Sequence, residues 1–511
     1  MAERNARGPA PDSAHALSKV LIANRGEIAV RVIRACRDLG IASVAVYSDI
    51  DRGALHVRLA DEAYPIGAAP AAESYLNIER VVAVGTRSGC DAVHPGYGFL
   101  AENADFADAV ASAKLVFVGP PAAVQRALGE KTAARRLARD AGVPVAEGSE
   151  ALSDVKAARS AARSIGYPIL LKPAGGGGGK GMRVVRSEPE LADAWRGAAG
   201  EASSAFGNAS LFVERYLEGA RHVEMQLLAD RDGAVVWLGE RDCSIQRRHQ
   251  KLVEETPGPS VDDALRERLG AAAVAIARAA RYENAGTVEF LVDPSGGFVF
   301  LEMNTRLQVE HPITEAVTGY DLVALQLRIA AGASLPFAQG GIERRGAAIE
   351  LRITAEDPYG GFLPAAGRIG PVRMPSGPGI RVDHALEAGA FVPTEYDPLL
   401  AKLIVWGADR PAALARARRA LRETVITGVP TSLPFHRQLL DDPGFNAGDY
   451  DTGYVAERWT GREAPRLGDG AAVAAAYVAA ALLRGPRAAA RQIANGTASA
   501  WTHAAREDAL R

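Results

Sequence analysis

Cysteine is scarce in this chain of 511 residues, which contains only Cys36, Cys90 and Cys243, far apart in the sequence. Three distant thiols argue against a disulfide framework and against a metal site built from closely spaced cysteines. Such usage is typical of a reducing compartment, so we expect a cytoplasmic protein.

Long apolar runs are missing as well. The alanine-rich stretch 471–483 is too short and too weakly apolar to cross a membrane. Residues 1–17 are polar, and Pro9 and Pro11 interrupt them, so they lack the apolar core of a secretory signal. We predict a disordered tail at residues 1–17 and no association with a membrane.

A large excess of charge of one sign is also absent, since the formal net charge is −2. This balance gives no reason to expect a nucleic-acid partner. The hydrophobic content of 48% and the charged content of 23% are ordinary for a globular protein, and the length allows several domains. We therefore expect a multidomain globular protein.

Among the features that are present, one alternation of polar and apolar residues stands out, and His311-Pro312 follows it. Read as an extended strand, it places alternate side chains on opposite faces. One face would carry carboxylates, amides and a guanidinium, from Glu302, Asn304, Arg306, Gln308 and Glu310. The same alternation also fits a half-buried edge strand with a solvated face.

The segment before this alternation favours a functional face. With Ser295-Gly296 as the two-residue turn of a hairpin, Glu289 in the preceding β-rich run lies directly opposite Glu302. Two facing carboxylates repel each other unless a cation or a proton lies between them. Such a pair suits Mg²⁺, which takes oxygen ligands and shares them with phosphates. We predict a metal–phosphate site that continues into an anion site at Arg306.

A run of five glycines, residues 175–179, follows the predicted strand Tyr167–Lys172. A glycine run can be a flexible linker, but strands on both sides favour a hairpin tip that closes over a ligand. No Ser or Thr follows Lys180, so this is not a Walker phosphate loop, although glycine N–H groups can still approach phosphates.

Three further patterns bear on fold and site. The β-turn-α-β opening, Val20–Tyr47, predicts a parallel α/β domain, in which Gly26 stands without the GxGxxG spacing of dinucleotide sites. The turn 92–100 is either structural or one of the ligand loops common at strand carboxyl ends. The charged run 240–251 is either a solvated surface or a set of cations that neutralise phosphate oxygens.

Several of these stretches resemble the biotin carboxylase family, a branch of the ATP-grasp ligases, over about residues 19–454. The motifs that carry the resemblance occur in the family's order: Ile22-Ala-Asn-Arg-Gly-Glu27, His94-Pro-Gly-Tyr-Gly-Phe-Leu100, Lys172-Pro-Ala-Gly-Gly-Gly-Gly-Gly-Lys-Gly-Met182, Glu240-Arg-Asp-Cys-Ser-Ile-Gln-Arg-Arg-His-Gln-Lys251 and Glu302-Met-Asn-Thr-Arg-Leu-Gln-Val-Glu-His-Pro312. The resemblance implies the reaction, in which ATP with Mg²⁺ (or Mn²⁺), bicarbonate and biotin give carboxybiotin, ADP and phosphate.

The resemblance also implies an α/β fold of ATP-grasp architecture. A Rossmann-like parallel domain would occupy residues 18–130, and an ATP-grasp domain with a glycine-rich lid at about 145–220 would occupy residues 131–340. An antiparallel-rich α+β domain would follow at 341–457, and a linker or helical tail at 458–511.

Roles are implied for the residues at matching positions. The nucleotide would contact Lys131, Lys172, Gly177, Gly178, Gly179, Glu214, Leu217, His222, Gln246, His249 and Leu291. The metal would bind Glu289 and Glu302, with Asn304 in support, and bicarbonate would bind Lys251, Arg306, Gln308 and the Val309 backbone. Glu310 matches the general base, and Arg352 matches an arginine that stabilises the biotin enolate.

These implied roles are chemically coherent. Phosphoryl transfer would activate bicarbonate as carboxyphosphate, which a closing lid would protect from water. Glu310 must be ionised to take the bicarbonate proton, and we expect nearby Arg306 to keep its pKa low. Arg352 is flanked by Leu351 and Thr354, where the bacterial proteins commonly have Cys and Asn.

No methionine is followed by Lys-Met, so the chain as given has no biotin attachment motif. We therefore expect a biotin carboxyl carrier protein and a carboxyltransferase as partners, and a homodimer as in much of the family. The leading hypothesis is the carboxylase component of an acyl-CoA carboxylase; the alternative is the biotin carboxylase part of a pyruvate or other biotin-dependent carboxylase. A ligase of the carbamoyl phosphate synthetase kind and a regulatory protein that only binds ATP fit the motifs less well.

Overall fold

The computed structural model describes residues 17–174, 182–206 and 209–459. Residues 1–16 of the predicted tail, residues 460–511 and the predicted nucleotide contacts Gly177, Gly178 and Gly179 lie outside these ranges. Among the described residues, no helix has the length and apolarity needed to cross a membrane.

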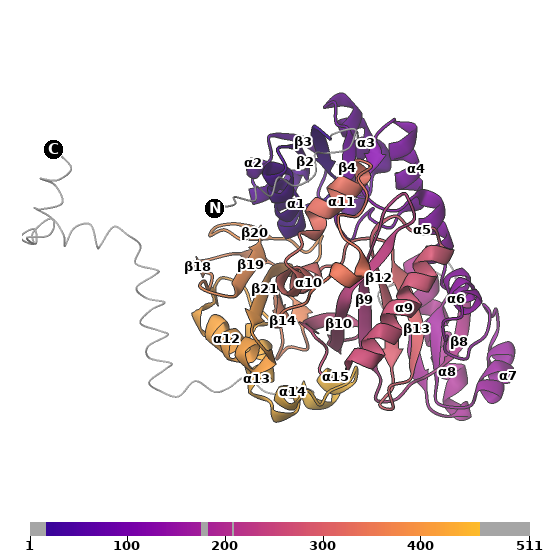
Figure 1. The fold of residues 1–511 in the computed structure, drawn as a ribbon. Helices are drawn as coiled ribbons and strands as arrows, with labels where there is room; N and C mark the ends of the chain where they lie inside the picture. The colour runs from indigo at the N-terminus through magenta and orange to yellow at the C-terminus, as the bar shows by residue number, and fades with distance from the viewer. Residues whose placement is uncertain (1–16, 175–181, 207–208, 460–511) are drawn as a thin grey trace, which may run out of the picture. The chain divides into compact units, whose positions relative to one another are not determined.

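The N-terminal part is a five-stranded parallel sheet in the order β3-β2-β1-β4-β5 (Figure 1), as its opening pattern predicts. Its strands are β1 (Lys19–Ile22), β2 (Ala42–Ser48), β3 (Glu62–Gly67), β4 (Ala92–His94) and β5 (Val116–Phe117). Its helices are α1 (Gly26–Asp38), α2 (Leu55–Leu59), α3 (Ile78–Arg87), α4 (Ala104–Ser112) and α5 (Ala122–Gly129). Gly26 has a φ of 65°, the left-handed conformation that the sharp strand-to-helix turn requires.

Side chains fill the carboxyl edge of this parallel sheet. Arg25 donates two hydrogen bonds to Asp51, at 2.6 and 2.7 Å, and the hydroxyl of Tyr75 donates a third, at 2.6 Å. The ring of Tyr396, from the C-terminal part, lies 4.3 Å from the Arg25 guanidinium, and its hydroxyl donates to Ser48 at 2.7 Å. The crevice where such sheets usually bind ligands is therefore occupied by the protein's own residues.

The centre of the molecule is an eight-stranded antiparallel sheet in the order β13-β12-β9-β10-β11-β14-β21-β19. The strands are β9 (Arg221–Ala229), β10 (Val235–Arg247), β11 (Gln250–Thr256), β12 (Asn284–Val292), β13 (Phe298–Asn304), β14 (Ala347–Thr354), β19 (Ile380–His384) and β21 (Leu399–Gly407). We predict a domain boundary at residues 340 and 341, but strands from both sides of it belong to this sheet, because β11 pairs with β14.

Helices cover this sheet and bury its apolar side chains. α6 (Lys131–Asp140) and α9 (Asp263–Ala279) enclose one core cluster with β9, β12 and β13 (Figure 1). α12 (Arg410–Glu423) and α13 (Leu433–Asp441) enclose a second cluster with β14 and β21. Residues 311–330 form two helices, α10 (His311–Thr318) and α11 (Leu322–Ala330), because Gly319 turns left-handed between them.

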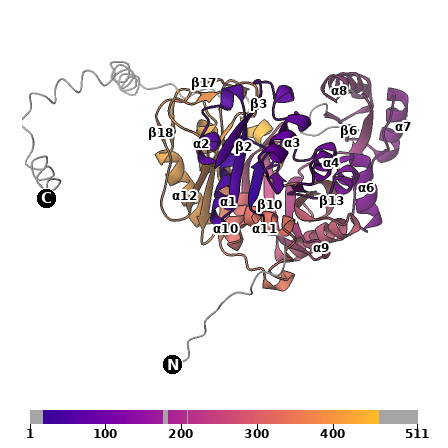
Figure 2. The ribbon, with the colours of Figure 1, turned by 90° about the horizontal axis from the view of Figure 1, so that it is seen from above.

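A smaller three-stranded sheet, with the order β7-β6-β8, lies within the segment that we predict to be a lid. Its strands are β6 (Ile169–Pro173), β7 (Arg183–Val185) and β8 (Leu211–Arg215), and its helices are α7 (Val155–Ile165) and α8 (Leu191–Phe206). These elements share a core of their own, and Figure 2 shows β6, α7 and α8 together at the right of the view. The glycine run joins β6 to β7, which pair antiparallel as expected for a hairpin.

Short elements complete the C-terminal part, which is rich in antiparallel pairs. They are β15 (Glu356–Asp357), β16 (Leu363–Pro364), β17 (Gly367–Arg368), β18 (Val372–Arg373), β20 (Phe391–Val392), β22 (Val425–Ile426), α14 (Pro443–Ala447) and α15 (Tyr454–Trp459).

Candidate active site

The hairpin of β12 and β13 places Glu289 directly opposite Glu302, as predicted, but by a different route. The turn is not Ser295-Gly296 alone: Asp293 to Gly297 close it, and the Asp293 carboxylate accepts hydrogen bonds from the Ser295 and Gly297 N–H groups. This turn pairs Val292 with Phe298, one residue out of the predicted register. A β-bulge between the Phe290 and Glu289 pairs then restores the register.

The predicted strand from Glu302 to Glu310 ends early, because β13 stops at Asn304 and α10 begins at His311. Pro312, near the N-terminus of α10, favours this helix start. The polar side chains of the intervening loop, residues 305–310, nevertheless converge. Arg306 donates to Asn304 at 3.0 Å and to Gln308 at 2.8 Å, and Gln308 donates to Glu289 at 3.1 Å.

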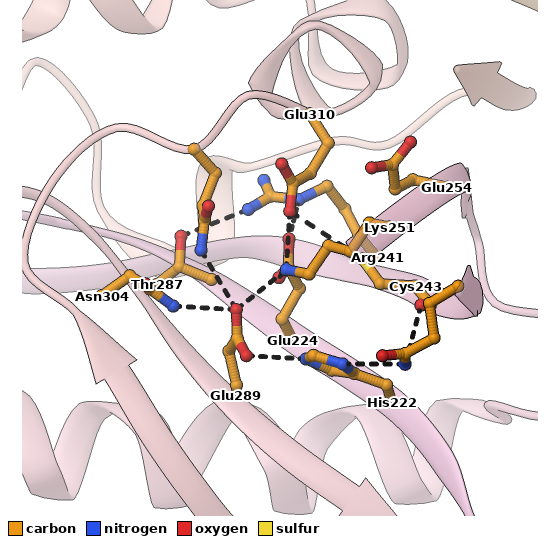
Figure 3. Close-up of polar contacts among 12 residues, drawn as sticks. His222, Glu224, Arg241, Cys243, Lys251, Glu254, Thr287, Glu289, Asn304 and Glu310 are labelled. Carbon is orange, nitrogen blue, oxygen red and sulfur yellow. Dashed lines mark hydrogen bonds and ion pairs between the residues drawn. The ribbon is translucent and has the colours of Figure 1, made fainter. Parts of the chain in front are cut away.

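Lys251, at the start of β11, is the centre of the site (Figure 3). Its ammonium contacts three buried carboxylates: Glu224 of β9, Glu289 of β12 at 2.8 Å and Glu310 of the loop at 2.7 Å. An ammonium has three donors, so each N–H is matched to one carboxylate. Three segments far apart in sequence are thereby held around one cation.

Glu289 is held ionised by its neighbours. Burial alone would raise its pKa, but Lys251 and His222 outweigh this effect and place the pKa well below its usual value. His222 lies 2.7 Å from Glu289, and Asn304 donates to it at 2.8 Å. The pKa of Glu302 is raised instead, first by burial and then by Glu289. A cation between the two carboxylates would relieve this repulsion, so Glu289, Glu302 and Asn304 fit the predicted metal site.

Two further sets of possible metal ligands lie close to Glu289 and Glu302. Among the described residues, His222, Glu224 and Glu289 bring three ligand atoms within 4.8 Å of one another, and so do Glu224, Cys243 and Glu310. Neither set includes Glu302. Lys251 already contacts Glu224, Glu289 and Glu310, so the protein itself supplies a cation to the carboxylates of both sets.

Glu310 lies between two cations. Arg352, on β14, donates to one of its carboxylate oxygens at 2.8 Å, and Lys251 contacts the other oxygen. Burial would raise the pKa of Glu310, but Lys251, Arg352 and Arg241 hold it well below the usual value. We expected Arg306 to supply this effect; Arg306 pairs with Glu102 at 3.0 Å and also interacts electrostatically with Glu310, but Lys251, Arg352 and Arg241 contribute more. Glu310 is therefore ionised, which is the form that a proton acceptor needs.

The nucleotide side is built from the lid and from α6. Lys172, at the end of β6, pairs with Glu214 of β8, and Arg135 of α6 lies 3.3 Å from the same carboxylate. Lys131 begins α6, and its pKa is lowered, mainly by burial, while Glu302 and Lys172 act on it electrostatically. Lys131 therefore connects the predicted phosphate contacts with the predicted metal carboxylates.

The other predicted nucleotide contacts are distributed around this side. Gln246 lies 3.3 Å from His222, and Leu291 is the cross-strand neighbour of His222. His249 occupies the tight turn between β10 and β11 with a φ of 66°. Leu217 is half-buried after β8. Val309, which we predict to bind bicarbonate through its backbone, accepts a hydrogen bond at its carbonyl from Lys402 at 3.0 Å.

The charged run 240–251 is not a solvated surface over most of its length, and its role toward phosphate oxygens stays a prediction. Its first part is the buried strand β10, and Arg241 there is fully buried. Arg241 donates to Glu224, to Gln226 at 2.7 Å and to Thr314 at 2.9 Å, so it supports the site from behind. Only the end of the run is exposed, where Arg247 donates to the Gly361 carbonyl at 2.6 Å.

Several residues of the site were not predicted as such. Glu224 and Arg241 form its floor, Glu254 pairs with Arg352, and Glu102 holds Arg306. The alternation of His222, Glu224 and Gln226 is the one sequence signal that points to this floor, because it puts three polar groups on one face of a strand. Burial raises the pKa of Glu254 to about 7.

Three family models match consecutive parts of the chain. They are the biotin carboxylase N-terminal domain at residues 16–124, the ATP-binding domain of the carbamoyl-phosphate synthase L chain at 130–338, and the biotin carboxylase C-terminal domain at 350–457. The biotin carboxylase models on both sides of the ATP-binding domain distinguish this arrangement from a carbamoyl phosphate synthetase.

Curated relatives match almost over their full length. The biotin carboxylase of Nostoc sp. is 51% identical over 440 residues, which are 86% of this chain and 98% of that protein. A pyruvate carboxylase component of Methanothermobacter thermautotrophicus is 50% identical over 448 residues, 88% of this chain and 91% of that protein.

Solved structures agree. The biotin carboxylase domain dimer of Hydrogenobacter thermophilus 2-oxoglutarate carboxylase, in complex with MgADP, ADP and bicarbonate, superposes with a TM-score of 0.85 at 46% identity. The match covers 88% of this chain and 100% of that one. The Campylobacter jejuni biotin carboxylase in complex with β,γ-ATP gives a TM-score of 0.85 at 43% identity, with coverage of 88% and 100%.

Proposed function

We propose which residues of this chain carry out each step of its reaction. The premise is that the chain belongs to the biotin carboxylase family of ATP-dependent ligases, which form a C–N bond. The substrates are ATP, bicarbonate and biotin, which we place on a separate carrier protein. The observation that carries the assignment is the buried contact chain Lys251–Glu310–Arg352, in which one carboxylate joins two cations.

The Lys251 end of this chain is the bicarbonate side. Arg306 and Gln308 lie beside Glu289 on the same side and offer N–H donors to a small anion. Glu310 is ionised and takes the bicarbonate proton, which makes the bicarbonate oxygen a nucleophile toward the γ-phosphoryl group of ATP. Lys131 and Lys172 lie on the opposite, nucleotide side, where they stabilise the phosphate oxygens during transfer.

Glu289 and Glu302, with Asn304 in support, would hold a divalent cation, which would supply further charge stabilisation for the transferring phosphoryl group. Lys251 and His222 keep Glu289 ionised for this task, and Asn304 orients it. Carboxyphosphate then breaks down to CO₂ and phosphate inside the closed site.

The Arg352 end is the biotin side. When the biotin nitrogen loses its proton to the released phosphate, the ureido oxygen becomes an enolate, and the nitrogen then attacks CO₂ and forms the new C–N bond. The guanidinium of Arg352 is permanently charged and planar, so it suits this oxygen. Glu254 holds Arg352 at its Nε atom, 2.6 Å away, and leaves the guanidinium oriented.

We place the chain in an acyl-CoA carboxylase, with a carrier protein and a carboxyltransferase as partners, in a homodimer and in the cytoplasm. A pyruvate carboxylase is the second candidate, because a component of one such enzyme is 50% identical to this chain. The final acceptor is chosen by the carboxyltransferase, so the test is reconstitution with carrier and carboxyltransferase of each kind, scored by incorporation of labelled bicarbonate into acyl-CoA or into pyruvate.

The half-reaction itself is tested by ATP hydrolysis with and without bicarbonate and free biotin. We expect hydrolysis to require bicarbonate and to be stimulated by biotin. Hydrolysis that ignores both would overturn the proposal, and hydrolysis that depends on ammonia in place of biotin would indicate a ligase of the carbamoyl phosphate synthetase kind.

A further inference from the structure

Lys402, on β21, is a fully buried lysine that none of the roles above uses. It lies directly opposite Arg352 in the β14–β21 register, so both side chains rise from the same face of the sheet. An ammonium without solvent is stable only where acceptors and negative charge surround it. Its partners therefore indicate what the position is built for.

Three different segments meet at the Lys402 ammonium. It donates to the carbonyl of Val309, in the loop before Glu310, at 3.0 Å. It lies 3.2 Å from Glu27 of α1 and 3.9 Å from Asp383 of β19. Its partners thus come from the N-terminal sheet domain, from the sheet edge and from the loop that carries the general base.

The Val309 carbonyl is a point where the loop needs an anchor. β13 ends at Asn304, so residues 305–310 are outside the sheet ladder. The Gln308 carbonyl accepts from the N–H and the ring of His311, and the Glu310 carbonyl accepts from Ile313, all contacts within the loop and α10. The Val309 carbonyl instead accepts from Lys402, which ties the loop to the strand beside Arg352.

We propose that Lys402 is a positioning residue for Glu310: its ammonium fixes the Val309–Glu310 peptide relative to β14 and so holds the Glu310 carboxylate between Lys251 and Arg352. This inference rests on the proposed role of Glu310 as the base. Glu27 and Asp383 supply negative charge beside the ammonium, and Asp383 is itself held by Arg381 through hydrogen bonds of 2.7 and 2.9 Å.

The test compares Lys402→Met with Glu27→Gln in the full chain. Lys402→Met removes the contact with the Val309 carbonyl, whereas Glu27→Gln removes only the ion pair and leaves that contact. Burial raises the pKa of Glu27 to about 7, so this carboxylate can take up a proton when the lysine is absent and Lys402→Met does not strand a buried charge.

We expect Lys402→Met to lower kcat for bicarbonate-dependent ATP hydrolysis by about 10- to 100-fold, the cost of a base displaced by about 1 Å, with little change in the KM for ATP. Glu27→Gln should keep the wild-type kcat even if it unfolds at a lower temperature. Lys402→Arg, which keeps a cationic donor, should recover part of the lost kcat. A purely structural lysine would instead lower the fraction of folded enzyme and leave kcat per ATP-binding site unchanged.

The proposal is overturned if Lys402→Met retains kcat per ATP-binding site, or if Glu27→Gln loses as much of it. If Lys402→Met does not fold, the double variant Lys402→Met/Glu27→Gln, which also removes the acid, and Lys402→Arg give the same comparison. Wild-type enzyme without bicarbonate-dependent hydrolysis would contradict the proposed function, whereas active wild type with an indifferent Lys402 would contradict only this inference.

Discussion

Two of the places where charged side chains are buried are organised differently. At the carboxyl edge of the parallel sheet, Asp51 is fully matched by Arg25 and Tyr75. On the face of the antiparallel sheet, Lys251 is shared by three carboxylates, and one oxygen of Glu254 is buried without a hydrogen-bond partner among the described residues. A closed set of partners holds a fold together, whereas a set with spare charge is prepared for ligands.

This difference explains why the edge of the parallel sheet, a usual ligand position, is not the site. Tyr396 and Arg25 fill it with stacked side chains. The parallel domain still reaches the active site through Glu102, which holds Arg306. Substitutions on the antiparallel face should therefore lower turnover, whereas substitutions at the edge of the parallel sheet should lower stability.

The largest effect on turnover is expected for Glu310→Gln, on the antiparallel face. The amide cannot accept the bicarbonate proton, so bicarbonate-dependent ATP hydrolysis should fall by about 100-fold or more. Steady-state ATP hydrolysis checks this, with the exposed Glu343→Gln as the matched control. A turnover near that of the control would show that another group is the base.

Arg352→Ala should come next and should split two activities. Carboxylation of free biotin should fall by about 100-fold because the enolate loses its counter-charge. ATP cleavage should fall less, since Lys251 still holds Glu310 ionised. Parallel assays of carboxybiotin and ADP measure the ratio, and Arg352→Lys, which keeps the charge, should lose less of the carboxylation. Equal loss of both activities would mean that Arg352 acts before the enolate forms.

Glu302→Gln should have a smaller effect, which excess metal corrects. Removing one of the facing carboxylates should raise the Mg²⁺ concentration needed for half-maximal activity by about tenfold or more, while the fold remains intact. Titration of activity with Mg²⁺ at saturating ATP, together with thermal unfolding, separates the two. An unchanged Mg²⁺ requirement would remove Glu302 from the metal site.

Asp51→Asn moves the comparison to the parallel sheet, where turnover per folded molecule should be unchanged. The half-buried Arg25 would lose its matched carboxylate, so the free energy of unfolding should fall by about 1–3 kcal/mol. Urea unfolding and kcat per ATP-binding site check the two halves of this statement. A large loss of kcat in well-folded enzyme would mean that this edge takes part in the reaction.

Tyr396→Phe should have the smallest effect. It removes the hydrogen bond to Ser48 and keeps the ring against Arg25, so the unfolding free energy should fall by about 1 kcal/mol. The same unfolding assay measures it. A loss as large as that of Asp51→Asn would show that the hydroxyl, and not the ring, closes the edge.

Much of the site could be predicted where one rule decides the outcome. The hairpin of β6 and β7 follows from strands on both sides of a glycine run. The pairing of Glu289 with Glu302 is predicted through a two-residue turn, but it holds only because the longer turn and the β-bulge shift the register in opposite directions. The end of β13 at Asn304 could not be predicted, because alternation continues in the sequence after the strand has stopped. The local sequence pattern does not show where the neighbouring strand stops offering hydrogen bonds.

Arg241 shows the other limit. A charged run usually indicates a solvated surface. Arg241 is nevertheless fully buried because Glu224, Gln226 and Thr314 satisfy its donors, and these partners lie up to 73 residues away in the sequence. Burial of a charge depends on such distant partners, which a single sequence does not connect.

The β-bulge in the β12–β13 hairpin separates two things that a regular hairpin would link. On its turn side the pairing follows the five residues 293–297; on its other side Glu302 keeps its place opposite Glu289. In a regular ladder a shift of one residue would turn Glu302 to the other face. We therefore expect that the tip of this hairpin can be exchanged or lengthened while Glu289 and Glu302 keep their pairing, so that a probe could be attached there.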